Sequence, residues 1–304
     1  MKIKILIPVY NDWQSVLKLL ENINSEILNL EHEFSVIIVN DASSEPIPEF
    51  SISLDKIVSI KLITMKENRG HARCNASGLK YIFENEDFDY VIPMDGDGED
   101  RPDEIKQFVD NLNYHQGKPI VGERIKRSEG IFFKFCYFFH KLVTYTFTGQ
   151  SIKFGNYTCL PKSIVEKMVN EKATWSSFSG SLAKVAKDRA GVPSERGPRY
   201  FGPSKMSFKS LVIHSLSIIS VFKTNVLIRS IFFLAIYMFL IYPNISAITL
   251  IPFVILVGLI FATFAVSKRE NLNEMKNSLA NISNIKVIKS VSYTHLTLPT
   301  ICSV

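Results

Sequence analysis

Over the first 120 residues, short apolar runs alternate with segments whose apolar residues recur at helical spacing. The runs are rich in β-branched residues and predict buried strands, whereas the intervening segments predict helices. The expected strands are Lys2–Val9, Phe34–Val39, Ser59–Ile63, Tyr90–Met94 and a short one around Ile120–Val121; the expected helices are one through Val16, Leu20, Ile23 and Ile27, then Gly70–Phe83 and Pro102–Leu112. Strands separated by helices favour an α/β fold with an open, mostly parallel sheet.

The C-terminal part of the chain has a different pattern, because residues 230–267 contain no charged residue. As one helix this stretch would be about 57 Å long, whereas the hydrocarbon core of a bilayer is roughly 30 Å thick, so two crossings fit better than one. A break is available at Pro243. We therefore predict a hairpin of membrane-spanning helices over residues 226–242 and 245–266, with a buried core hairpin as the alternative. Lys and Arg flank both ends, which predicts that both ends lie in the cytoplasm.

The two patterns together predict how the chain is divided. The expected segments are a cytoplasmic α/β domain (1–205), an amphipathic juxtamembrane helix (206–225), the transmembrane hairpin (226–267) and a cytoplasmic tail (268–290) that stops short of the natural C-terminus. Residues 291–304 read like a translated sequencing adapter, with a genuine polar tail as the alternative, and carry no fold prediction. The N-terminal apolar run is too short for a secretory signal.

Composition narrows the functional classes. Hydrophobic residues make up 46% of the chain and charged residues 21%, which excludes wholesale disorder. Four cysteines without a CxxC pair do not indicate a disulfide scaffold or a cysteine-rich zinc site. The net charge of +6 suits anionic partners in general, and it does not select nucleic acid over phospholipid or nucleotide.

One basic stretch of the chain is also aromatic. Residues 118–153 hold seven Lys and Arg against two Asp and Glu, together with six Phe and Tyr between residues 132 and 139. A helix of this composition can lie in the headgroup layer of a membrane, although a core helix with solvated lysines is the alternative. Residues 206–222 hold apolar side chains in helical register and form a second candidate for an interfacial helix.

The sharpest chemical feature is the acidic loop Asp95-Gly-Asp-Gly-Glu-Asp100, which follows an apolar strand. Four carboxylates in six residues repel one another, and a bound cation removes this cost. An EF-hand loop would need Gly at its sixth position and Glu at its twelfth, where this chain has Asp100 and Lys106. The remaining interpretations are an acidic surface turn and an Asp-x-Asp site that holds Mg²⁺ or Mn²⁺ against a diphosphate.

Polar residues also follow the first two predicted strands, at the edge where parallel α/β sheets bind their ligands. Asp41 can accept hydrogen bonds from a nucleoside there, or it can form a plain turn. No GxGxxG motif occurs, so a dinucleotide oxidoreductase is not indicated. His71 lies beside the Asn68–Gly70 turn, where it could contact a phosphate, but a position on the helix surface is favoured.

Six short motifs occur in a defined order along residues 3–267. They are Ile7-Pro-Val-Tyr-Asn-Asp12, Val39-Asn-Asp-Ala-Ser-Ser44, Asn68-Arg-Gly70, Met94-Asp-Gly-Asp97, Val121-Gly-Glu-Arg-Ile-Lys-Arg127 and Arg199-Tyr-Phe-Gly-Pro-Ser-Lys205. Together they resemble family 2 glycosyltransferases, whose catalytic domain has the Rossmann-like GT-A fold. With the C-terminal hairpin, the chain is similar to the polyprenyl-phosphate branch of that family, which includes dolichol-phosphate mannose synthase.

The resemblance implies a role for each matching position. Four residues would line the nucleoside pocket: Pro8, Tyr10, Asp12 and Asp41. Three would hold the metal and the donor diphosphate: Asp95, Asp97 and Glu99, the last where relatives often have Gln. Arg124 would meet the acceptor phosphate. Three more would close over the diphosphate as a mobile loop: Arg199, Ser204 and Lys205.

The chain also departs from the family pattern. Relatives often read Gly-(Asp/Ser)-Phe-Arg where this chain has Gly155-Asn-Tyr-Thr158, and the lost Arg leaves the acceptor open. The Gln-x-x-Arg-Trp motif of processive polysaccharide synthases is absent, and two helices could not enclose a translocation pore. A single transfer is therefore favoured.

The expected activity is a metal-dependent, inverting transfer of one hexose from a UDP- or GDP-sugar to a polyprenyl phosphate at the cytoplasmic membrane face. A phosphate monoester is largely dianionic at neutral pH, so it needs cations to position it rather than a general base. Transfer to a hydroxyl of a lipid-linked glycan is the first alternative, and it would need a base such as Asp100. The second alternative is a catalytically silent nucleotide-binding membrane protein. A homo-oligomer stays open, and no nucleic-acid partner is expected.

Overall fold

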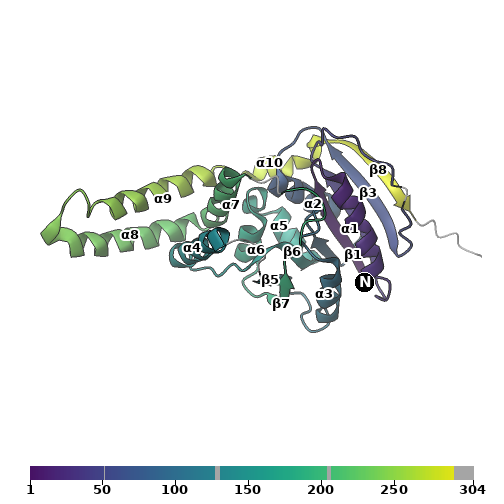
Figure 1. The fold of residues 1–304 in the computed structure, drawn as a ribbon, viewed down its shortest axis with the longest axis horizontal. Coiled ribbons are helices and arrows are strands. Elements are labelled where there is room, and N and C mark those ends of the chain that lie inside the picture. The colour runs from purple at the N-terminus through teal and green to yellow at the C-terminus, as the bar shows by residue number, and fades with distance from the viewer. Residues whose placement is uncertain (51, 127–130, 204–206, 291–304) are drawn as a thin grey trace, which may run out of the picture.

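A single eight-stranded sheet forms the centre of the molecule (Figure 1) in the computed structural model, which describes all residues except 51, 127–130, 204–206 and 291–304. Its strands are β1 (Lys2–Val9), β2 (Glu33–Asn40), β3 (Ile57–Met65), β4 (Tyr90–Pro93), β5 (Ile120–Lys126), β6 (Phe154–Pro161), β7 (Ala190–Glu195) and β8 (Ile282–Ser290). The strand order is β7-β5-β6-β4-β1-β2-β3-β8. The β4-β1-β2-β3 block and the β5-β7 pair are parallel, whereas β6 and β8 are antiparallel to their neighbours. The expected open, mostly parallel sheet is confirmed.

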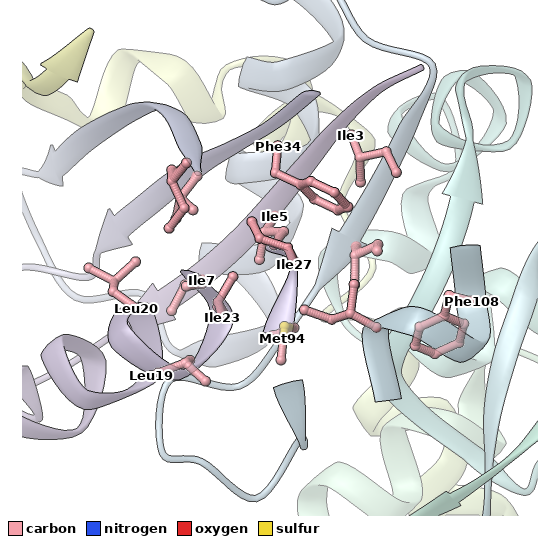
Figure 2. Close-up of a cluster of buried hydrophobic side chains, with 14 of the residues drawn as sticks. Ile3, Ile5, Ile7, Leu19, Leu20, Ile23, Ile27, Phe34, Met94 and Phe108 are labelled. Carbon is pink, nitrogen blue, oxygen red and sulfur yellow. The ribbon is translucent and has the colours of Figure 1, made fainter. Parts of the chain in front are cut away.

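Helices cover both faces of this sheet, because its central strands are apolar on both sides. One face carries α1 (Trp13–Glu26), η1 (Pro102–Glu104) and α3 (Ile105–Asn111); the other carries α2 (His71–Asn85), α5 (Lys162–Val169), η2 (Lys172–Trp175) and α6 (Phe178–Val185). Within β1, Ile5 belongs to the first core and Leu6 to the second, since successive side chains of a strand point to opposite faces. Figure 2 shows the first core, where β1 meets α1 through Ile3, Ile5, Ile7, Leu19, Leu20, Ile23 and Ile27.

The parallel pairing brings the carboxyl ends of three strands to one edge of the sheet. Val9 is paired with Asn40, and Leu6 with Pro93, so the chain leaves β1, β2 and β4 on the same side. The polar segments that follow these strands therefore lie together, as the sequence predicted. In open parallel sheets this edge is where ligands bind.

Two apolar helices project from the α/β domain as a hairpin (Figure 1). They are α8 (Lys223–Ile241) and α9 (Ile251–Ser267). The helical segments that contain them, Lys223–Asn244 and Ile251–Lys276, are long and apolar enough to cross a membrane. Most of their side chains are exposed, and Phe239 reaches 81% exposure, whereas a core hairpin would bury such residues. Two further helices lie at the base of the hairpin: α4 (Ile131–Thr148) and α7 (Phe208–Ser220).

The turn of the hairpin is longer than the sequence predicted. The first helix begins at Lys223 and ends in a 3₁₀ turn, η3 (Tyr242–Asn244), and the second begins at Ile251 rather than at residue 245. Ser246 N donates to Thr249 Oγ1 over 2.8 Å in the connecting turn. Such side-chain bonds compete with the helical backbone pattern, which is why the helix starts later.

The segment after the hairpin corrects the expectation of a cytoplasmic tail over residues 268–290. It forms α10 (Leu272–Lys276) and η4 (Ser278–Asn281) and then returns to the sheet as β8, beside β3 (Figure 1). Met275 is fully buried in the second core. Asn281 accepts a hydrogen bond from Lys66 N and donates one to Glu67 O. Apolar burial and backbone pairing thus make this segment part of the α/β domain.

Candidate active site

The loops that follow β1 and β2 hold each other at the carboxyl edge. Asn11 N donates to Ser43 Oγ over 2.9 Å, and Glu45 N donates to Asn11 Oδ1 over 3.1 Å. Asn11 and Ala42 both adopt left-handed backbone conformations, with φ of 51° and 56°, which non-glycine residues seldom adopt outside functional sites. The interlocked loops leave the ring of Tyr10 exposed at this edge.

Asp41 is buried below these loops and binds the turn that precedes α2. Its carboxylate accepts hydrogen bonds from Arg69 N over 3.0 Å and from Gly70 N over 2.8 Å. Burial raises the pKa of Asp41 above its usual value, and the two amide bonds only partly oppose this. The residue predicted for the nucleoside pocket therefore first holds the Asn68–Gly70 turn in place.

The acidic loop, residues 95–100, is folded back on itself after β4. Asp95 N donates to Asp100 Oδ2, and Glu99 N donates to Asp97 Oδ1, each over 2.9 Å. Burial, reinforced by the charge of Asp95, raises the pKa of Asp97 to about 6 and that of Asp100 to about 8. The pKa of Asp95 itself lies below its usual range, because nearby His71 and Arg124 outweigh its burial. The carboxylates of the loop thus repel one another when they are ionised, which destabilises the loop in the absence of a cation.

One flank of the acidic loop is covered by residues 196–200, which we call the strap. Arg199 lies between two carboxylates: Nη2 is 2.8 Å from Asp12 Oδ2, and Nη1 is 2.5 Å from Asp97 Oδ2. Arg196 forms an ion pair with Glu99. The strap therefore supplies two guanidinium groups to three of the acidic side chains.

Backbone contacts fasten the strap to the same loop. Gly197 N donates to Glu99 O over 2.9 Å, and Tyr200 N donates to Asp97 O over 3.0 Å. The ring of Tyr200 lies against Gly98, where a Cβ atom would come within 2.5 Å of it, and Gly98 has a φ of 87°. A glycine at position 98 thus permits both the backbone turn and the close approach of the ring.

The other flank, which we call the helix flank, is polar and is formed by residues at the start of α2 and in β5 and β6. His71 Nε2 is 3.2 Å from Asp95 Oδ1 and 2.7 Å from Asn156 Nδ2. Arg124 lies against Gly155, where a Cβ atom would be only 2.8 Å from its Nη2 atom, and its charge contributes to the low pKa of Asp95. His71 lies on the exposed first turn of α2, as expected, and its imidazole also contacts the acidic loop.

The structure brings most of the predicted site residues together around this loop. Asp12, Asp97, Glu99 and Arg199 meet on the strap side, and Asp95 and Arg124 on the helix side. Pro8 supports the loop through its carbonyl oxygen, which would lie 3.0 Å from a Cβ at Gly96. Ser204 and Lys205 lie outside the described residues. Sequence reasoning missed the contacts of His71, Asn156, Arg196 and Tyr200, although the motif that begins at Arg199 pointed to the strap.

The acidic loop can hold a divalent ion whose other ligands are supplied by a phosphate group and by water. No cluster of three or more His, Cys, Asp or Glu side chains suited to a metal occurs among the described residues, and Glu99 is paired with Arg196. Mg²⁺ needs only one or two protein carboxylates when substrate phosphates and water complete its shell. Asp95 and Asp97 can supply these two carboxylates, and Asp97 is already paired with a cation.

Comparison with known proteins shows which family model and which proteins the chain matches. The family model described as glycosyl transferase family 2 matches residues 4–164, which is more than half of the chain. Two similar proteins are undecaprenyl-phosphate 4-deoxy-4-formamido-L-arabinose transferases. The one from Photorhabdus laumondii subsp. laumondii is 29% identical over 219 residues, and the one from Salmonella choleraesuis is 26% identical over 219 residues. Each match covers 69% of this chain and 65% or 64% of the relative, so the chain spans slightly less than two thirds of their length.

Solved structures share the fold at low sequence identity. Glucosyl-3-phosphoglycerate synthase from Mycobacterium tuberculosis, in complex with Mn²⁺, uridine-diphosphate-glucose and phosphoglyceric acid, has a TM-score of 0.53 and 11% identity, covering 74% of this chain and 79% of that one. A mannosyltransferase from Pyrobaculum calidifontis, in complex with GDP-Man and Mn²⁺, has a TM-score of 0.50 and 14% identity, covering 91% and 74%. These similarities confirm the GT-A fold of the α/β domain.

Proposed function

The chain belongs to glycosyl transferase family 2, and from this premise we propose that it transfers one hexose from a UDP- or GDP-sugar to a polyprenyl phosphate at the cytoplasmic face of a membrane. The observation that carries the proposal is the acidic loop at the carboxyl edge of the sheet, with arginines on both flanks. Two relatives named for transfer to undecaprenyl phosphate support the acceptor class.

The donor would bind across the ends of β1, β2 and β4. Pro8, Tyr10, Asp12 and Asp41 would line the nucleoside pocket, and the exposed ring of Tyr10 is available to a ligand there. Arg199 would turn from its two carboxylates to the diphosphate, with Ser204 and Lys205 after it. An arginine is suited to both partners, because its guanidinium matches carboxylate and phosphate oxygens alike.

A divalent ion, Mg²⁺ or Mn²⁺, would be held by Asp95 and Asp97, with Glu99 as a third ligand once it leaves Arg196. When bound, it would supply positive charge to the departing diphosphate. The protein adds Arg199 to the same task, and preorganised charges of this kind supply much of the rate enhancement in such reactions. The raised pKa values of Asp97 and Asp100, caused by burial and by the charge of Asp95, show that an added cation would stabilise the ionised loop, which supports this assignment.

The acceptor phosphate would approach along the helix flank, where Arg124 lies beside Gly155. An oxygen of the phosphate dianion would attack the anomeric carbon directly, on the side opposite the departing diphosphate. The new glycosidic bond forms as the bond to the diphosphate breaks, and the configuration at that carbon inverts. No proton has to be removed from a dianion, so Arg124 has only to orient it.

The hairpin would hold the α/β domain on the membrane, with the helices at its base in the headgroup layer. α4 exposes Phe138, Phe139, Leu142 and Tyr145, as an interfacial helix would. Arg229 of α8 donates to Thr146 O over 2.9 Å, and Asn225 donates to Thr148 O over 3.0 Å. These bonds satisfy carbonyls at the end of α4 and attach it to the hairpin. The segments 1–205, 206–225 and 226–267 remain our proposed functional division.

The alternative acceptor, a glycan hydroxyl, is less well supported. It would need a base near the sugar, and the candidate Asp100 is 5% exposed and accepts a hydrogen bond from Asp95 N. A base must reach the proton that it removes. A catalytically silent nucleotide-binding protein would not need arginines on both flanks of the acidic loop.

The proposal is tested with the detergent-solubilised full chain, Mg²⁺ or Mn²⁺, and a panel of UDP- and GDP-sugars. Undecaprenyl phosphate is added or withheld, and both lipid-extractable sugar and released nucleotide are counted. We expect transfer that depends on the lipid phosphate, with one donor preferred. Donor hydrolysis without labelled lipid would favour a hydroxyl acceptor, and the absence of nucleotide binding would favour the silent protein.

A further inference from the structure

Three polar atoms from three separate elements meet on the helix flank. His71 Nε2 and Asn156 Nδ2 are 2.7 Å apart, and they lie 3.2 Å and 3.3 Å from Asp95 Oδ1. The three residues come from the start of α2, from β6 and from the loop after β4. A carboxylate oxygen can only accept hydrogen bonds, so at this corner it is held by nitrogen donors from two rigid elements.

A buried side chain of α2 also lies beside the imidazole of His71. Asn75 lies one helical turn further along, is 1% exposed, and places Nδ2 3.0 Å from His71 Nε2. All three contacts of the imidazole are made by Nε2. When Nε2–H donates to Asp95 Oδ1, the same nitrogen cannot accept hydrogen bonds from the two amide groups, which then only lie beside it. The side chain is 44% exposed to solvent.

The consequence for Asp95 is that its two oxygens differ. Oδ1 lies in the corner of His71 and Asn156, whereas no hydrogen bond or ion pair to Oδ2 occurs within the described part of the chain. The backbone of the residue is fixed as well, since Asp95 N donates to Asp100 Oδ2. The carboxylate therefore has a defined orientation before any ligand arrives, with one oxygen committed and one available.

The carboxylate of Asp97, in contrast to that of Asp95, is not oriented by a helix or a strand. Its Oδ2 atom is paired with Arg199 of the strap, and its Oδ1 atom accepts a bond from Glu99 N within the loop. Neither contact comes from a helix or a strand. The orientation of Asp97 thus depends on the acidic loop and the strap, whereas that of Asp95 depends on α2 and β6.

We propose that His71, together with Asn156, is a positioning residue that fixes the Asp95 carboxylate so that Oδ2 faces the cation and diphosphate of the donor. This inference rests on the proposed function, because it takes Asp95 as a ligand of the donor complex. Residues that orient metal-binding side chains in this way commonly contribute 10- to 100-fold to metal affinity.

The test compares His71→Leu with His71→Gln in the full chain. Leu removes every polar atom of the side chain, whereas Gln keeps an amide that can reach Asp95 and Asn156. Binding of Mn²⁺ in the presence of UDP or GDP is followed by electron paramagnetic resonance, and kcat and KM for the donor are measured alongside. We expect the Kd of Mn²⁺ to rise about 10-fold or more in His71→Leu and to return to within about threefold of wild type in His71→Gln.

Two further variants keep the test independent of folding. His115→Leu removes a histidine of the segment after α3 and should leave both Kd and kcat unchanged. Asn156→Ala removes the second member of the corner and should raise the Kd in the same direction as His71→Leu. If His71→Leu fails to fold, the Asn156→Ala result decides: an unchanged Kd overturns the proposal.

The outcomes also separate this inference from the proposed function. A wild-type chain that binds no Mn²⁺ with either nucleotide contradicts the donor site itself. A wild-type chain that binds Mn²⁺ with nucleotide, beside a His71→Leu variant with the same Kd and KM, overturns the positioning role alone. A loss that His71→Gln does not restore also overturns it, because the role assigned to the side chain is hydrogen bonding.

Discussion

On the strap side of the acidic loop the contacts come from Arg196, Arg199 and Tyr200, whereas on the helix side they come from His71 and Asn156. The strap has no regular secondary structure and directly follows β7. The residues of the helix side stand on α2 and β6, whose buried apolar side chains belong to the two cores. The side chain of Asp97 is thus held by the strap, whereas that of Asp95 is held by a helix and a strand of the α/β domain.

This difference indicates which contacts of the acidic loop a bound ligand can replace. Arg199 is a cation between Asp12 and Asp97, so a divalent ion can replace it at Asp97 while the guanidinium moves to phosphate oxygens. Exchange of one cation for another leaves the charge of the loop compensated throughout. On the helix side, Asp95 Oδ2 has no hydrogen bond or ion pair within the described residues, so no contact there has to be exchanged.

The largest effect is expected from Asp97→Ala, which removes one of the two carboxylates that we propose hold the divalent ion. Turnover should fall about 1,000-fold or more, since several kcal/mol of charge stabilisation at the diphosphate are lost. The fold should persist, because Asp97 lies outside both cores. Transfer assays and thermal unfolding check the two statements, and retained activity with unchanged metal dependence would contradict the site.

A smaller effect with two signs is expected from Arg199→Ala. The donor reaction should slow about 100-fold, because a charge that stabilises the leaving diphosphate is gone. Mn²⁺ alone, without nucleotide, should bind more tightly than in wild type, since Asp12 and Asp97 lose their competing cation. Kinetic assays and a Mn²⁺ titration measure these two effects.

The matched control for that variant is Arg101→Ala, whose guanidinium is exposed and paired with Asp103. It should change neither the rate nor the affinity for Mn²⁺. If Arg199→Ala weakened the binding of Mn²⁺ in the absence of nucleotide, the idea that the ion replaces Arg199 would be contradicted. The strap would then form part of the metal site whether or not a ligand is bound.

The smallest of the three effects is expected from Gly98→Ala, which disturbs the strap through its packing alone. The new Cβ would come within 2.5 Å of the Tyr200 ring, in a backbone with φ of 87°. We expect kcat/KM to fall about tenfold as the strap is displaced. Gly117→Ala is the control, because Gly117 also has a positive φ, of 74°, but no atom lies within 4 Å of the added Cβ.

Both glycine variants should lose about 1–2 kcal/mol of stability, since both place a side chain on a left-handed backbone. Only Gly98→Ala should lose activity beyond what that destabilisation explains. Equal activities in the two variants would mean that the fit of Tyr200 on the acidic loop has no part in the reaction.

The strands and the site loops were predictable from the sequence because their signals are local. Apolar runs such as Lys2–Val9 match the observed strands, and the parallel arrangement then brings Asp12, Asp41 and Asp95 to one edge. The late start of α9 was not predicted, since it depends on the hydroxyl bonds of the turn between the helices.

The rest of the site depends on contacts between distant parts of the chain. His71 meets Asn156 across 85 positions of sequence, and neither residue differs locally from an ordinary helix or strand residue. β8 likewise looks like a tail after an apolar hairpin, and only its pairing with β3, some 220 residues earlier, makes it a strand. Neither the contact between His71 and Asn156 nor the strand β8 could be predicted without knowing which distant residues lie beside them.

The most direct test of the account is the position of a bound Mn²⁺ ion, located by its anomalous scattering in crystals of the full chain grown with Mn²⁺ and UDP or GDP. The account predicts a single peak between the carboxylates of Asp95 and Asp97, within ligand distance of the nucleotide diphosphate, with Arg199 moved from Asp12 onto the diphosphate. A peak away from the acidic loop, or a nucleotide bound while Arg199 still bridges Asp12 and Asp97, would contradict it.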